Sequence, residues 1–237
     1  MSALTLNDVA VAGRLAPVTL ALGPGQTVGL VGPNGSGKST LMQAAGGLLP
    51  YSGRVGWNGQ WLADIPMMER GRMTAWVPQE AHFEFGFTVR SVVAQGRYAF
   101  GDDELGVEAA LARFDLTTLA HRPVNRLSGG ERHRVLLARA IATGASIHLW
   151  DEPLGALDPR HGLKVLALAD ELKHTGGTVM MSLHDLRVAY YLDQVVVLSE
   201  GRLQAVGRPH DVLTPALLHD VFGVRAEFVS SLVLKLR

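Results

Sequence analysis

The clearest chemical signal is the run Gly32-Pro33-Asn34-Gly35-Ser36-Gly37-Lys38-Ser39, which fits the pattern G-x-x-x-x-G-K-[ST] and is followed by Thr40. Glycines let a backbone curl so that successive N–H groups point into one concavity, where they bind anions. In this pattern Lys38 reaches the β- and γ-phosphates of a nucleotide, and the Ser39 hydroxyl binds Mg²⁺. An ordinary glycine-rich turn has a similar composition. A nucleotide phosphate site is favoured because an apolar, β-branched run over 27–31 precedes the loop and a helical pattern follows it.

Two adjacent carboxylates, Asp151 and Glu152, follow an apolar strand predicted over 146–150. Asp151 suits Mg²⁺ ligation next to Ser39, either directly or through a bound water. Glu152 is expected to point the other way and to polarise a water for in-line attack on the γ-phosphate. The alternative is an acidic pair at a helix start, which Pro153 would also suit. A phosphate loop in the same chain favours the catalytic interpretation.

Two further polar residues, Gln79 and His184, follow strands predicted over 74–77 and 178–182. Taken alone, such residues are more often surface or structural groups. The carboxyl ends of parallel strands meet at one edge of a sheet, so we expect both to lie near the phosphate loop and Glu152. There Gln79 would contact Mg²⁺ or the attacking water, and His184 would hold the γ-phosphate.

A second anion site is predicted at Ser128-Gly129-Gly130, which precede an amphipathic helix over 132–142. Ser128 is a good helix cap, and the bare N–H groups after it attract anions. The alternative is a simple capped helix. One phosphate loop with two anion sites favours a symmetric dimer, in which this second site of each chain covers the nucleotide of the other.

Strands and helices alternate between 27 and 199, which predicts an α/β fold with a parallel sheet and crossover helices. The segment 80–126 lacks strand signals and predicts an inserted helical subdomain. His148 and Trp150, inside a buried strand, are expected to be packed and hydrogen-bonded rather than catalytic. The strands predicted over 194–199 and 202–206 form a hairpin, further strands are predicted over 4–11 and 18–22, and residues 225–236 have β character.

The composition is that of a folded globular protein, with 47% hydrophobic and 19% charged residues in a chain of 237. The 22 basic and 22 acidic residues cancel, which argues against nucleic acid as the main partner. Cysteine is absent, which excludes disulfides and thiolate metal sites and fits a reducing compartment. We see no signal-peptide pattern and no apolar run near the ~18 residues that span a bilayer. A role at a membrane would therefore need a partner protein.

The order and spacing of these motifs resemble those of ATP-binding cassette (ABC) ATPase subunits over nearly the whole chain. The combination is far more specific than any one motif. The residues that carry the resemblance are Gly32 to Ser39, Gln79, Leu127-Ser128-Gly129-Gly130-Glu131, Asp151-Glu152-Pro153, Leu157-Asp158 and His184.

This resemblance implies a P-loop NTPase (RecA-like) core with an antiparallel β edge subdomain, in residues 1–79 and 143–237, and a helical subdomain in 80–142. It also implies ATP and Mg²⁺ as cofactors and a head-to-tail homodimer that encloses two ATP. Gln79 would belong to the Q-loop, Asp158 to the D-loop, and His184 would be the switch histidine. The family usually stacks an aromatic ring on adenine upstream of the phosphate loop, but no aromatic residue precedes Tyr51.

Residues 88–98 and the segments after His184 resemble importers of iron chelates, haem and cobalamin. This implies a peripheral ATPase subunit on the cytoplasmic face of the inner (plasma) membrane. Its partners would be polytopic permease subunits and, indirectly, a periplasmic or surface substrate-binding protein, with no nucleic acid. The alternative is a soluble ABC-type ATPase in DNA repair, translation or cofactor assembly, although the chain lacks the long insertion and second cassette of such relatives. A P-loop kinase would not need Ser128, and a nucleotide sensor would not need Glu152.

Overall fold

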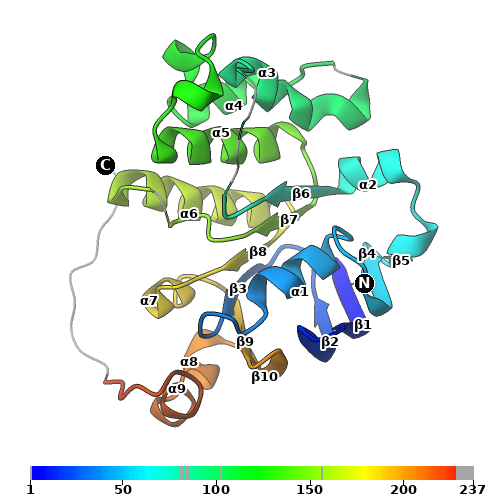
Figure 1. Ribbon diagram of the computed structural model, residues 1–237, viewed down its shortest axis with the longest axis vertical. Helices are drawn as coiled ribbons and strands as arrows, with labels where there is room; N and C mark the ends of the chain where they lie inside the picture. The colour runs from blue at the N-terminus through cyan, green and yellow to red at the C-terminus, as the bar shows by residue number, and fades with distance from the viewer. Residues whose placement is uncertain (1, 81–82, 84–85, 102, 156, 228–237) are drawn as a thin grey trace.

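The computed structural model describes residues 2–80, 83, 86–101, 103–155 and 157–227. Within these residues the chain forms two sheets, one of four strands in the order β2-β1-β4-β5 and one of six in the order β10-β9-β3-β8-β7-β6. A helical layer lies above the larger sheet in Figure 1, and the smaller sheet lies at its side. This architecture confirms the predicted α/β fold with an antiparallel edge sheet.

The smaller sheet is antiparallel throughout. Its inward side chains alternate with exposed ones, as expected for a sheet with one solvated face. The second strand begins at Leu15, three residues before the predicted start at Val18, because the turn after the first strand is tight. Its strands are β1 (Leu4–Val11), β2 (Leu15–Leu22), β4 (Ser52–Trp57) and β5 (Gln60–Trp61).

The larger sheet is parallel except for its last strand, which pairs antiparallel with its neighbour. Every residue of its three central strands β3, β8 and β7 is buried. This burial explains their continuous apolar runs, since helices or another sheet cover both faces. The strands are β3 (Thr27–Val31), β6 (Thr74–Val77), β7 (Ile147–Trp150), β8 (Thr178–Ser182), β9 (Gln194–Ser199) and β10 (Arg202–Gly207).

Two hydrophobic cores lie on opposite faces of the larger sheet. Successive side chains of a strand point to opposite faces, so Leu30 packs in one core and Val31 in the other. The first core joins this sheet to the smaller sheet through α1 (Lys38–Ala45). The second joins it to α6 (Pro159–His174) and to the helical layer.

The helical layer is built around α5 (Gly129–Ala142), which carries the predicted second anion site at its start. Between α4 and α5 the chain forms only short 3-10 helices. The other elements of the layer are α3 (Val89–Ala94), η2 (Gln95–Phe100), α4 (Val107–Arg113), η3 (Thr117–Leu119) and η4 (Val124–Arg126).

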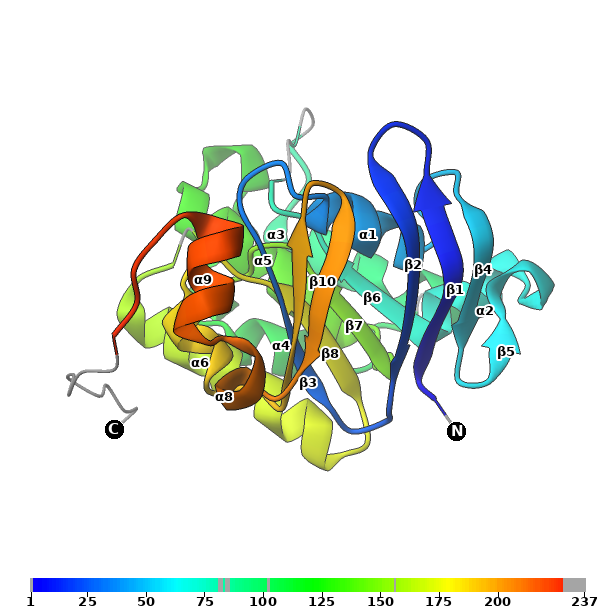
Figure 2. The ribbon, with the colours of Figure 1, turned by 90° about the horizontal axis from the view of Figure 1, so that it is seen from below.

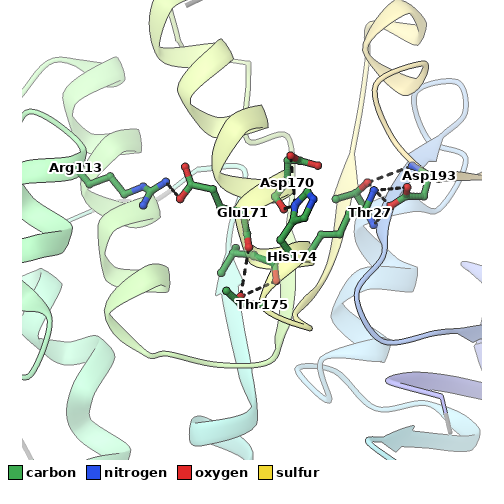
Figure 3. A network of polar contacts seen from close by, with 9 residues as sticks. Thr27, Arg113, Asp170, Glu171, His174, Thr175 and Asp193 are labelled. Carbon is green, nitrogen blue, oxygen red and sulfur yellow. Dashed lines mark hydrogen bonds and ion pairs between the residues drawn. The ribbon is translucent and has the colours of Figure 1, made fainter.

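Polar contacts at the end of α6 tie the layers together, as Figure 3 shows. Arg113 of α4 forms an ion pair with Glu171 of α6. Lys173 of α6 lies 2.6 Å from Asp193, whose other carboxylate oxygen accepts a hydrogen bond of 2.8 Å from the Thr27 backbone N–H of β3. Through α6 the helical layer is therefore connected to the start of the strand that carries the phosphate loop.

After β10, short helices lie beside β9 and β10 (Figure 2). Residues 225–227 are irregular, and the rest of the predicted 225–236 strand lies outside the described residues. The remaining elements are η1 (Leu62–Asp64), α2 (Met67–Met73), α7 (Leu186–Ala189), α8 (Pro209–Val212) and α9 (Pro215–Phe222).

His148 and Trp150 of β7 were both expected to be packed and hydrogen-bonded, and the structure confirms this only in part. His148 donates one hydrogen bond, of 2.9 Å, from its Nε2 to Ala145 O, and its ring contacts Trp150 edge to face. The Trp150 indole N–H is buried and has no hydrogen-bond partner among the described residues, so its expected hydrogen bond is wrong. Packing in the core holds this side chain in place.

Candidate functional site

The phosphate loop joins the end of β3 to the start of α1. Gly35 and Gly37 have φ angles of 78° and 98°, which L side chains rarely adopt. A Cβ atom at Gly32 would lie 2.1 Å from the carbonyl oxygen of Leu198. The glycines therefore serve a curled loop that passes close to the neighbouring strand.

Lys38 is buried and lies across this loop, where its Nζ donates hydrogen bonds of 2.8 Å to Gly32 O and 3.0 Å to Pro33 O. Burial lowers its pKa, while the negative charges of Glu152 and Asp151 raise it and offset part of this effect. A partly desolvated ammonium group bonded only to neutral carbonyls has room for a stronger, anionic ligand. The position suits phosphate binding.

Two turns from distant parts of the chain close around the loop. Gly201, in the β9–β10 turn, donates from its N–H to Ser36 O at 3.1 Å and accepts at its carbonyl from Ala16 N at 2.8 Å. The resulting hollow has a volume of about 610 Å³. Its lining residues are Gly13, Arg14, Asn34, Gly35, Gly37, Lys38, Ser39, Thr40, Gln79, Glu152, His184, Glu200 and Gly201.

Glu152 stands in this hollow with both carboxylate oxygens engaged. Oε2 accepts a hydrogen bond of 2.9 Å from Gln79 Nε2, and Oε1 lies 2.6 Å from His184 Nε2. The backbone of Glu152 has a φ of 52°, an uncommon conformation for a residue with a side chain. Three predicted site residues from the ends of three strands thus meet at one carboxylate, in a conformation that the surrounding structure must impose.

Asp151 is not among the residues that line the hollow and is only 3% exposed. Its Oδ1 accepts a 2.6 Å hydrogen bond from Ser182 Oγ, and the same hydroxyl accepts a 2.8 Å bond from the Glu152 N–H. Ser182, at the end of β8, therefore fixes both acidic residues. Sequence reasoning missed it, although a serine in an otherwise apolar buried strand was a signal that could have been used.

The second predicted anion site lies apart from the residues that line the hollow. Ser128 caps α5 by accepting from Glu131 N at 3.3 Å, and Glu131 Oε2 accepts a 2.7 Å bond from Ser128 N. Gly129 and Gly130 form the first residues of α5. Asp158 caps α6 by accepting from His161 N at 3.0 Å, and it too lies outside the hollow. Their contact with a nucleotide stays a prediction.

The donor set around the phosphate loop fits Mg²⁺ bound together with a nucleotide. Nowhere in the described part of the chain do three or more His, Asp or Glu side chains gather as a metal site of their own. Ser39 and Gln79 line the hollow, and Asp151 lies behind it, so phosphate oxygens and water must complete any coordination shell. The Ser36 hydroxyl is buried in the loop without a hydrogen-bond partner among the described residues.

Comparison with known protein families agrees with this geometry. Residues 15–155 match the model of the family described as ABC transporter. The chain belongs to the ABC transporter family. Among curated ABC proteins it is 44% identical to the hemin import ATP-binding protein HmuV of Pseudomonas entomophila, over 89% of this chain and 87% of that protein. It is 41% identical to the cobalamin import ATP-binding protein BtuD of Halobacterium salinarum, over 92% of this chain but only 58% of that protein.

Solved ABC structures share the fold. An ATP-binding subunit of an ABC transporter superimposes with a TM-score of 0.82 at 28% identity and covers 95% of both chains. An inward-facing metal-chelate type ABC transporter has a TM-score of 0.79 at 25% identity, with 95% of this chain and 90% of that chain covered. None of the helices in the described part of this chain has the length and hydrophobicity that crossing a bilayer requires.

Proposed function

We propose that the chain is the ATPase subunit of a binding-protein-dependent ABC importer for an iron chelate (a siderophore or haem) or cobalamin. The observation that carries the proposal is the meeting of Gln79, Glu152 and His184 beside the Lys38 loop. This is the arrangement needed to hold a triphosphate and to position a water against it. The importer class and its cargo rest on relatives named for hemin and cobalamin import.

In the proposed reaction the loop from Gly32 to Ser39 and the N-terminus of α1 bind the phosphates of ATP. Lys38 would exchange its two carbonyl contacts for the β- and γ-phosphates. Mg²⁺ would neutralise phosphate charge, with Ser39 and Gln79 as ligands and Asp151 oriented by Ser182 behind them. Glu152 would then orient the attacking water and accept its proton.

A head-to-tail homodimer would complete the site. Ser128 and Gly130 of the partner subunit would contact the γ-phosphate from the N-terminus of α5, and Asp158 would lie at the same junction. The N–H groups at the start of α5 support this contact, because apart from the capping bonds they have room to donate to a phosphate. His184, released from Glu152, would then bind the γ-phosphate.

Adenine would be held without an aromatic ring. Arg14, in the turn between β1 and β2, is exposed and lines the hollow beside Lys38 and Thr40. The planar guanidinium of arginine stacks on aromatic faces. We therefore assign Arg14 as the base contact.

The membrane partner would be a polytopic permease that docks between the core and the helical layer. Two adjoining hollows there, of about 400 and 380 Å³, share Gln95 and Tyr98. Met67, Met68 and Tyr98, exposed by 76%, 47% and 65%, lie on the elements that border them. With such a partner the subunit would lie on the cytoplasmic face of the inner membrane, and a periplasmic or surface binding protein would act on the other side.

The test is a pull-down of the tagged chain from detergent-solubilised membranes of its native host. A polytopic membrane protein in a one-to-one ratio is expected. The reconstituted complex with its binding protein should then hydrolyse ATP faster with one of cobalamin, haem or a ferric siderophore. Recovery of soluble partners alone would overturn the importer proposal and leave the ATP chemistry standing.

A further inference from the structure

His133, near the start of α5, is a buried histidine to which the proposed reaction gives no part. It is only 5% exposed, and its Nε2 lies 2.9 Å from the carbonyl oxygen of Pro153. A carbonyl oxygen can only accept, so Nε2 carries the proton and donates this hydrogen bond. Burial lowers the pKa of His133 from its ordinary value of 6.5, and the bond to Pro153 offsets part of this effect. The ring is therefore neutral at about pH 7, with its single N–H bonded to Pro153.

Pro153 directly follows Glu152, the proposed general base, and belongs to the same tight turn. The Glu152 N–H donates to Ser182 Oγ at 2.8 Å, and the Glu152 carbonyl accepts from the Gly155 N–H at 3.2 Å. With a φ of 52°, the Glu152 backbone needs surrounding contacts that hold it in place. His133 supplies one of them, because it holds the carbonyl one residue after Glu152.

This restraint comes from the helical layer, whereas Ser182 belongs to the larger sheet. α5 packs against α3 and α4 of that layer, and Ser128 caps its start. Gly129 and His133 are four residues apart in α5, so they lie about one turn, or ~6 Å, apart on the same side of the helix. One helix thus carries both the N–H groups proposed to contact the other subunit's nucleotide and the imidazole that holds the Glu152 turn.

We propose that His133 is a positioning residue for ATP hydrolysis, which fixes the Glu152 turn to α5 and so directs the Glu152 carboxylate towards the attacking water. This role rests on the function proposed above for Glu152. His133 acts through the Pro153 backbone and is not among the residues that line the hollow. Without the bond the turn can shift against α5, and a misplacement of about 1 Å can cost up to ~100-fold in rate. The phosphate loop is not touched, so the affinity for ATP should stay the same.

Two amide side chains separate this hydrogen bond from the polarity of the residue. The Nε2 of glutamine lies as many bonds from Cα as the Nε2 of histidine, and it carries N–H donors. The amide nitrogen of asparagine ends one bond earlier. His133→Gln should therefore keep the bond to Pro153 O, and His133→Asn should lose it. His133→Met fills the buried space with a flexible side chain that has no donor.

The experiment measures kcat for ATP hydrolysis and ATP affinity by equilibrium dialysis for the full chain and its variants. His133→Met and His133→Asn are expected to lower kcat ~10- to 100-fold with ATP affinity unchanged, and His133→Gln should restore a kcat close to wild type. Leu136→Val, 2% exposed in the same helix, is the control for packing, because it should lower the melting temperature and keep kcat. Thermal unfolding checks that each variant is folded at the assay temperature.

The outcomes separate this inference from the function on which it rests. Wild-type kcat in folded His133→Met and His133→Asn would overturn the inference and leave the ATPase function standing. A loss of kcat that His133→Gln does not restore, or that Leu136→Val shares, would assign His133 to packing and also overturn it. If His133→Met does not fold, the comparison of His133→Asn with His133→Gln decides. Turnover at the wild-type rate in Glu152→Gln would overturn the role of Glu152 and this inference together.

Discussion

Glu152 and His184 are in direct contact: Glu152 Oε1 lies 2.6 Å from His184 Nε2. The other oxygen, Oε2, accepts from Gln79. Both oxygens of this carboxylate are therefore occupied by side chains of the protein itself. A water can bind to Glu152 only where one of these contacts is given up, so we expect nucleotide binding to draw Gln79 or His184 away.

Replacement of Glu152 by glutamine tests its role as a general base. The amide keeps the shape of the side chain but cannot take a proton, so hydrolysis should fall by ~100-fold or more. Nucleotide binding and ATP-dependent dimerisation should persist. Phosphate release measures hydrolysis and equilibrium dialysis measures nucleotide binding, with the surface change Glu69→Gln as control. Turnover at the wild-type rate in Glu152→Gln would remove Glu152 from the mechanism.

Ser182→Ala tests the hydroxyl that joins Asp151 to Glu152. The variant leaves the buried Asp151 carboxylate and the Glu152 N–H without this partner, which should cost ~1–3 kcal/mol in the free energy of unfolding. Hydrolysis should also fall, because the strained Glu152 backbone loses a restraint. Urea unfolding and a phosphate assay check both effects. Ser199→Ala, at the partly exposed end of β9, should change neither. A fully stable and active Ser182→Ala would show that Ser182 does not position the site.

The convergence of Gln79, Glu152 and His184 was predictable from sequence for a simple physical reason. Each follows a short, apolar strand, and parallel strands bring their carboxyl ends to one edge. What could not be predicted is that Gln79 and His184 both contact the Glu152 carboxylate. A hydrogen bond between side chains 73 residues apart, such as Gln79 to Glu152, leaves no local pattern.

The closing turns of the hollow escaped sequence analysis for the same reason. Gly201 links Ser36 to Ala16 through backbone groups, and backbone hydrogen bonds do not depend on residue type. Arg14 was visible only as a residue of a turn between two strands. At Trp150 the residue type suggested a hydrogen bond that the structure lacks. The indole N–H is buried without a partner among the described residues, because packing in β7 outweighs the hydrogen bond.

Two glycines of the phosphate loop differ in what an added Cβ atom would meet. At Gly32 a Cβ would meet Leu198 O at 2.1 Å and Ser36 Oγ at 2.6 Å, whereas nothing lies within 4 Å of a Cβ at Gly35. Gly35→Ala should therefore cost only ~1–2 kcal/mol, from its left-handed φ. Gly32→Ala must displace a strand carbonyl and should cost more, with loss of ATP binding. Thermal unfolding and nucleotide titration measure both variants. Equal effects would show that the loop relaxes freely away from β9.

The buried His148 predicts a loss of stability in acid. Burial lowers its pKa from 6.5 to about 4. Its Nε2 already donates to Ala145 O. If Nδ1 also took up a proton, this new N–H would find no acceptor among the described residues. The unfolded chain therefore binds this proton more readily than the folded one. Stability is complete above pH ~6.5 and is lost progressively as the pH falls towards 4.

The expected size of this loss is ~3 kcal/mol, from the shift of the His148 pKa at about 1.4 kcal/mol per pH unit. His148→Gln keeps a hydrogen-bonding group but does not titrate, so its urea-unfolding free energy should fall less between pH 7 and pH 4.5. Part of the slope should remain, because burial also lowers the pKa of His133, which bonds Pro153 O at 2.9 Å. His219→Gln, at an exposed position of α9, should keep the full wild-type slope. Parallel curves for His148→Gln and wild type would place the acid sensitivity elsewhere.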